Sequence, residues 1–88
     1  MSMQAGFVSG AILMYEHMRE LREDKGLGQK DIARYLKVHQ TTYSDYELGK
    51  LNIPISALIK LSVFYNTSID YLLDQTDNPQ PYERKNNK

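Results

Sequence analysis

Two short amphipathic segments, separated by only three residues, constrain the fold of this chain more than any other feature. Residues 29–36 and residues 40–48 each carry apolar side chains at helical spacing, with Lys37, Val38 and His39 between them. So short a connection allows two helices to meet only at a tight turn. The residues expected to face inward are Ile32, Ala33, Leu36, Val38, Tyr43 and Tyr46.

The rest of the chain predicts three further short helices and no strand. One starts near Met14 and ends at Gly26, since glycine suits the left-handed position after a helix. Another follows Pro54, with Ile55, Leu58, Ile59 and Ser62 on one face and Leu61 and Tyr65 beside it. The last runs from Ile69 to Leu73 or Asp74, with Ser68 as its N-cap. We therefore expect an all-α, compact five-helix bundle.

Size and composition exclude several classes of protein. The chain has 88 residues, which is enough for one domain. It has no cysteine, which excludes a disulfide framework and a thiolate metal site or nucleophile. No glycine-rich phosphate loop or nucleophile–base pair is recognisable. We expect a cytoplasmic protein that is not an enzyme, with no metal, no cofactor, no small-molecule ligand and no membrane contact.

The two ends of the chain differ from its middle. Residues 1–13 are mostly small and apolar without a helical stripe, and we expect a flexible N-terminal extension. The alternative is that Phe7, Val8, Ile12 and Leu13 cover a dimer surface. Residues 14–75 would form the domain. Residues 76–88 form a polar C-terminal tail with two prolines, expected to be mostly extended or disordered.

The outer face of the second segment carries the functional signal. Two short helices joined by a three-residue turn have the outline of the DNA-binding helix-turn-helix. With its apolar residues inward, residues 40–48 would expose Gln40, Thr41, Ser44 and Asp45. In a major groove, glutamine can pair with adenine, threonine can reach a base edge, and aspartate can accept from cytosine. The alternative is an ordinary solvated surface.

Several segments, in this order and spacing, resemble one family. They are MRELREDKGLGQKDIARYL, TTYSDYELGK, IPISALIKLSVFYNTSIDYLL and the closing TDNPQPY. The chain is similar here to the Cro/repressor-type helix-turn-helix regulators, also called the xenobiotic-response-element type. The resemblance covers residues 14 to about 82. It implies a bundle of the phage-repressor DNA-binding type, with the helix-turn-helix formed by the second and third helices.

The resemblance also implies roles for individual residues. Gln40, Thr41, Ser44 and Asp45 would contact DNA bases. The DNA backbone contacts are assigned to Gln29, His39, Lys50 and Asn52. Arg22 and Glu47 match a structural ion pair that ties the first helix to the end of the third.

Four positions depart from the family pattern. Lys37 stands where glycine is common, and a left-handed conformation there costs a lysine about 1–2 kcal/mol. Gly28 and His39 are less typical N-caps than serine or threonine. Asp45 replaces a residue that is often Gln, Arg or Lys, and a carboxylate repels phosphate unless it meets a cytosine amine.

These features predict a sequence-specific regulator of transcription that binds double-stranded DNA, most simply a repressor. Its 11 Lys+Arg and 11 Asp+Glu give a net charge of zero, which predicts weak binding by one subunit. We therefore expect a homodimer on a pseudo-palindromic operator. Its contact surface would come from Ile69, Leu72 and Leu73, from the tail or from residues 1–13.

Two other functions remain open from the sequence. One is an antitoxin- or immunity-type regulator that a protein partner controls. The other is a protein-interaction helix bundle that has lost DNA binding, which the zero net charge and Asp45 favour.

Overall fold

The computed structural model describes residues 14–82, which contain five helices and no strand. The helices are α2 (Glu16–Asp24), α3 (Gln29–Leu36), α4 (Gln40–Glu47), α5 (Ile55–Tyr65) and α6 (Ile69–Leu72). The predicted all-α class is confirmed. The expectations for residues 1–13 and 83–88 lie outside the described residues. Within residues 14–82, no helix is long and apolar enough to cross a membrane.

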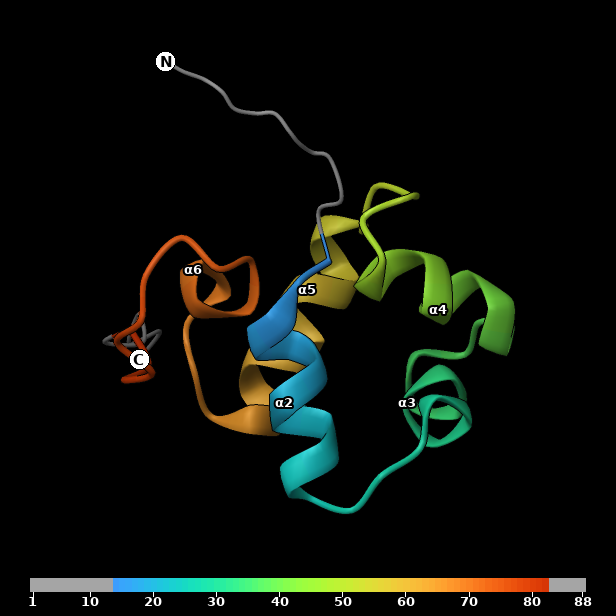
Figure 1. The fold of residues 1–88 in the computed structure, drawn as a ribbon, viewed down its shortest axis with the longest axis horizontal. Helices are drawn as coiled ribbons and strands as arrows, with labels where there is room; N and C mark the ends of the chain where they lie inside the picture. The colour runs from blue at the N-terminus through green and yellow to red at the C-terminus, as the bar shows by residue number, and fades with distance from the viewer. Residues whose placement is uncertain (1–13, 83–88) are drawn as a thin grey trace, which may run out of the picture.

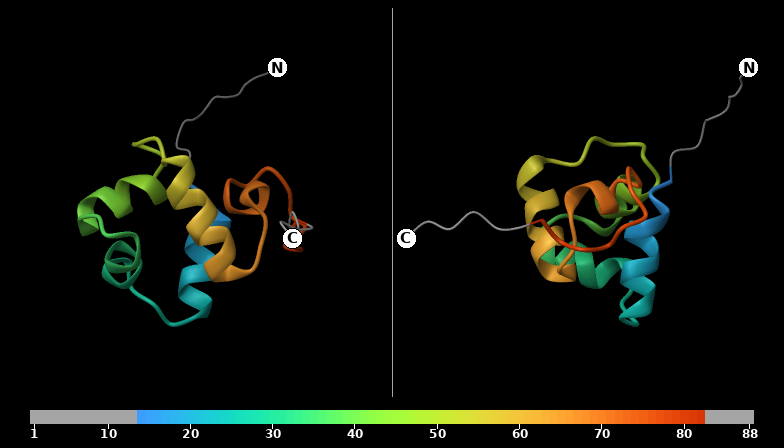
Figure 2. Two further views of the ribbon diagram at one scale, coloured as in Figure 1. Left: turned by 180° about the vertical axis from the view of Figure 1, so that it is seen from behind. Right: turned by 90° about the vertical axis from the view of Figure 1, so that its left-hand side faces the viewer.

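The helices surround one small core. Figure 1 shows α3 and α4 on one side of α2 and α5, with α6 on the other. In the side view of Figure 2, α2 and α5 lie on opposite faces of the molecule. The buried apolar residues come from all five helices: Met18, Ile32, Ala33, Leu36, Tyr43, Tyr46, Ala57, Leu61, Tyr65 and Leu72. The inward residues predicted for α3 and α4 are thus in the core, with Val38 packed against it.

The turn between α3 and α4 depends on a left-handed residue. Lys37 ends α3 with a φ of 62°, and its N–H donates to Arg34 O at 3.1 Å. The next N–H, of Val38, donates to Ala33 O at 2.9 Å. These bonds satisfy carbonyls at the end of α3. Lys37 therefore keeps the conformation that usually belongs to glycine.

The residues predicted to form one apolar face of α5 differ in burial. Ser62 is buried with Leu61 and Leu58 is half-buried, but Ile55 and Ile59 are exposed. The core lies closer to the Ala57 side of the helix than the sequence pattern indicated.

The prediction that Leu72 contributes to a dimer surface on the last helix is wrong. Leu72 is fully buried in the core, and Leu73 packs against the core from its edge. A four-residue helix needs these side chains to hold it on the bundle, so Leu72 is not available to a partner.

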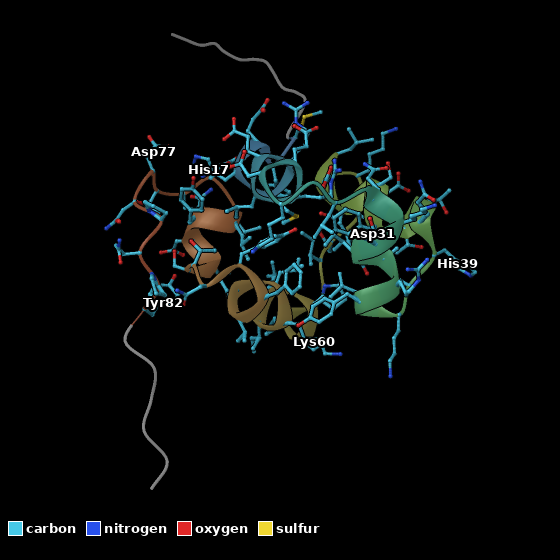
Figure 3. The ribbon with its side chains drawn as sticks, turned by 90° about the horizontal axis from the view of Figure 1, so that it is seen from below. His17, Asp31, His39, Lys60, Asp77 and Tyr82 are labelled. Atoms are coloured by element: carbon cyan, nitrogen blue, oxygen red, sulfur yellow. The ribbon has the colours of Figure 1, made fainter. Side chains whose placement is uncertain are left out.

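The first part of the tail is bound to the bundle, although it has no regular secondary structure. Thr67 Oγ1 donates to Pro79 O at 2.6 Å, and Asp70 N–H donates to Tyr82 Oη at 3.3 Å. His17 Nε2 lies 3.1 Å from Asp77 Oδ1 (Figure 3). Residues 76–82 are therefore not a free extension, because these contacts hold them against α2, α6 and the turn before α6.

Replacing Lys37 with glycine tests the left-handed turn. Lys37→Gly is expected to raise the free energy of unfolding by about 1 kcal/mol, because the strain removed exceeds the added freedom of the unfolded chain. Chemical denaturation measures it. Asn66, also exposed and at a φ of 54°, gives the matched control. Asn66→Gly should gain less because asparagine tolerates this region. A loss of stability in Lys37→Gly would contradict the argument.

Candidate nucleic-acid interface

The four residues predicted to contact bases lie on two successive turns of α4. Gln40 and Thr41 begin the helix and are exposed, whereas Ser44 and Asp45 are half-buried one turn later. Tyr43 and Tyr46 occupy the opposite side of α4 and are buried in the core. The helix therefore has one face fixed by packing and one polar face open to a ligand.

The residues predicted to contact the DNA backbone flank this row. His39 precedes α4 as its N-cap, with an exposed side chain that makes no capping hydrogen bond (Figure 3). Lys50 and Asn52 are exposed in the segment after α4, and Gln29 begins α3. The structure thus places the proposed backbone contacts at both ends of the proposed base contacts.

The start of α3 is capped in an unusual way. Gly28 is the N-cap and has no side chain, but its N–H donates to Asp31 Oδ2 at 2.8 Å. Asp31 N–H donates back to Gly28 O at 3.1 Å. The Asp31 carboxylate thus supplies half of a capping box.

The zero net charge hides an uneven distribution. Four exposed cations lie on α3, at its end and after α4 (Lys30, Arg34, Lys37 and Lys50), while Lys25 and Lys60 are exposed elsewhere. The exposed anions lie on α2, on α6 and after it: Glu16, Glu20, Glu23, Asp24, Asp70, Asp74 and Asp77. On α3 and α4, Asp31 and Asp45 are half-buried. Figure 3 shows His39 and Asp77 at opposite ends of the molecule. The α3–α4 side is therefore more positive than the total charge suggests.

A buried ion pair holds the end of α4 against α2. Arg22 Nε donates to Glu47 Oε2 at 2.7 Å, and Arg22 Nη2 donates to Oε1 at 3.2 Å. A further bond from Arg22 Nη1 to Leu27 O, 2.9 Å long, fixes the loop before α3. The structure thus joins the two residues that the family resemblance paired.

Two more residues complete this network, and the sequence analysis did not identify their part in it. Tyr43 Oη donates to Glu47 Oε2 at 2.6 Å, and Gln29 Nε2 donates to Glu47 Oε1 at 3.3 Å. Tyr43 precedes Glu47 by four residues, a spacing that brings side chains together on a helix. That signal was available in the sequence. The contact of Gln29 depends on tertiary packing and was not.

The network sets the protonation of its members. Burial alone would raise the pKa of Glu47, but hydrogen bonds from Arg22, Tyr43 and Gln29 and the charge of Arg22 outweigh it and lower that pKa. The hydrogen bond to Glu47 raises the pKa of Arg22 against the effect of burial. Burial and then the bond to Glu47 raise the pKa of Tyr43. The pair is therefore ionised and the phenol neutral near pH 7.

Comparison with known proteins agrees with this geometry. A helix-turn-helix family model matches residues 18–72, which include all of α3 and α4. The chain belongs to this helix-turn-helix family. No solved structure matches it.

Among its relatives is an uncharacterised HTH-type transcriptional regulator of Bacillus subtilis, YobD, 34% identical over 83% of this chain and 66% of its own length. The HTH-type transcriptional regulator ImmR of the same organism is 34% identical over 70% of this chain and 49% of its own. DdrOP3 of Deinococcus deserti is 36% identical over 67% and 46%. The chain thus spans about half to two thirds of these curated relatives.

Acidification should weaken this helix-turn-helix domain through Glu47. Its folded pKa lies below the unfolded value of about 4.3, so its stabilising contribution is present above that value and is lost as pH falls through the folded pKa. Between about pH 5 and pH 2, the free energy of unfolding should fall less in Glu47→Gln than in the unaltered chain. Urea denaturation across this range measures both slopes. Glu20→Gln, which removes an exposed α2 carboxylate, controls for the lost charge. Equal slopes in Glu47→Gln and the unaltered chain would contradict the assignment.

Two buried tyrosines offer a matched test of the network. Tyr43→Phe should lower the free energy of unfolding by about 1.5–3 kcal/mol, because its hydroxyl bonds a carboxylate. Tyr65 Oη is buried without a hydrogen-bond partner within residues 14–82. Tyr65→Phe should therefore cause no loss. Thermal unfolding followed by circular dichroism measures both variants, and equal losses would show that the bond to Glu47 adds nothing.

Proposed function

We propose that this chain is a sequence-specific regulator of transcription that binds double-stranded DNA, and that it acts as a repressor. One observation carries the proposal: the outer face of α4 carries exposed Gln40 and Thr41 and half-buried Ser44 and Asp45, while its other face packs in the core. Short side chains with both donors and acceptors suit the edges of bases in a major groove. The family membership and the names of the relatives support the same function.

The proposed binding mode follows from the ends of the helices. The start of α4 enters the major groove, so that Gln40 and Thr41 reach base edges and Ser44 and Asp45 follow one turn later. Lys50, Asn52 and His39 contact phosphates on either side. Gln29 gives one amide hydrogen to Glu47, so its second hydrogen can meet a phosphate beside the positive end of α3.

The mode of regulation is occlusion of a promoter by two subunits. One subunit has no excess of cations over anions, so its non-specific binding is weak. Two copies related by a twofold axis would read half-sites about 34 Å apart, which requires a pseudo-palindromic operator. Control by a partner protein remains compatible with this mode.

Replacing Gln40 tests base recognition. A duplex selected by the full chain from a randomised pool serves as the site, and Gln40→Ala should bind it about 1–3 kcal/mol more weakly. The loss should be concentrated at one base pair in each half-site, where discrimination relaxes. Fluorescence anisotropy on single-base variants of the site measures this. If the pool yields no preferred sequence, the result would favour the alternative function, a protein-interaction bundle without DNA binding.

Lys50→Ala is the matched control for charge. Lys50 is exposed after α4 and is assigned to phosphate, so its loss should weaken all duplexes alike and lower the salt slope by about one. If Gln40→Ala instead weakens all sequences equally, as Lys50→Ala should, then Gln40 does not read bases.

A further inference from the structure

Among residues 14–82, the outer face of α5 is an exposed apolar stripe. The stripe consists of Ile55, Ile59 and Val63, spaced four residues apart, with exposed fractions of 74%, 47% and 57%. Their opposite side of the helix, with Ala57 and Leu61, is in the core. Residues four apart lie above one another on a helix, so the three side chains form one continuous surface.

The composition of α5 is that of a helix covered on both sides. Its sequence, ISALIKLSVFY, contains a single charged residue, Lys60. Exposed Ser56 and Lys60 form a polar row beside the stripe, but an apolar helix face is normally buried. Lys60 follows Ile59 by one residue, so it projects about 100° away and sits at the edge of the stripe. The stripe itself therefore offers no charge to solvent or to a charged partner.

The spacing of the stripe allows it to pair with the same stripe on a second copy of the chain. It is symmetric about Ile59, because Ile55 and Val63 lie four residues before and after it. A twofold axis at Ile59 pairs Ile59 with its equivalent and Ile55 of each copy with Val63 of the other. Such reciprocal pairing is what a twofold-symmetric interface requires.

The position of α4 selects the antiparallel arrangement. In Figure 1 and in the rear view of Figure 2, α3 and α4 lie to one side of α5 and not beyond either end. A twofold axis that turns both α4 helices toward one DNA duplex must then cross α5 and not run along it. Two α5 helices related by a crossing axis are antiparallel, which agrees with the pairing of Ile55 and Val63.

We propose that the α5 stripe (Ile55, Ile59 and Val63) is the contact between two copies of this chain on DNA, with the α5 helices antiparallel. This inference rests on the proposed function, since the DNA fixes the direction of the axis. A standard interface covers about 800 Å² per partner, more than three side chains provide. The free dimer is therefore weak, and adjacent half-sites raise the effective concentration of the second copy.

Single cysteines test the geometry directly, because the chain has none of its own. Under mild oxidation on the selected duplex, Ile59→Cys should form a disulfide-linked dimer, since a disulfide needs two Cβ atoms about 4 Å apart. Ile55→Cys alone should not, whereas a mixture of Ile55→Cys and Val63→Cys should. Glu20→Cys, exposed on α2 across the molecule from α5, is the matched control. Cross-linking of Ile55→Cys with itself would overturn the antiparallel arrangement.

Ile59→Lys tests the energetics and separates this inference from the proposed function. Sedimentation equilibrium should show self-association at least about tenfold weaker than in the unaltered chain, with Glu20→Lys unchanged. On DNA, Ile59→Lys should keep its affinity for an isolated half-site and lose cooperative binding to the full site.

The remaining outcomes decide between the two proposals. Unchanged cooperativity in Ile59→Lys would overturn the α5 interface and leave DNA recognition intact. The same conclusion would follow if the chain stays monomeric on the full site because a partner protein or its own residues 1–13 occupy the stripe. Self-association through Ile59 with no preferred DNA sequence would support the stripe as a contact between copies. It would refute the proposed function.

Discussion

The buried ion pair between Arg22 and Glu47 is the interaction on which the rest of the structure depends. It connects α2 to the end of α4, and Arg22 also holds the loop before α3 through Leu27 O. Tyr43 and Gln29 extend the same network into α4 and α3. Removing one charge of a dry pair costs about 3–5 kcal/mol, because the other is left uncompensated. A domain this small depends on such a connection to fix the angle of α4.

Because the inner face of α4 is held in the core, its outer face can carry polar residues that the core does not need. The separation of charge follows the same division of the molecule. Cations such as Lys37 and Lys50 lie beside α4, while Asp74 and Asp77 lie with α6 and the bound tail. A net charge of zero is therefore compatible with a surface that attracts DNA, and it keeps non-specific attraction low.

Much of the fold was predictable because local chemistry and burial agreed. The apolar spacing of residues 29–36 and 40–48, with three residues between them, defined both helices of the motif to within one residue. Lys37 adopts the left-handed conformation expected from its place in the turn. The prediction failed where one pattern allowed two interpretations. Because α5 has apolar residues on two faces, its periodicity could not show that Ile55 faces solvent while Leu61 faces the core.

The sequence by itself determined the helices, the turns and the polar row on α4, because spacing, capping and left-handed positions act over a few residues. Only the tertiary structure decided which faces meet. It brought Gln29 to Glu47, buried Leu72, and bound the tail through Thr67 and Pro79. These contacts join residues far apart in the chain, and their pairing depends on how all the helices share one small core. Local sequence patterns do not show how the helices share that core.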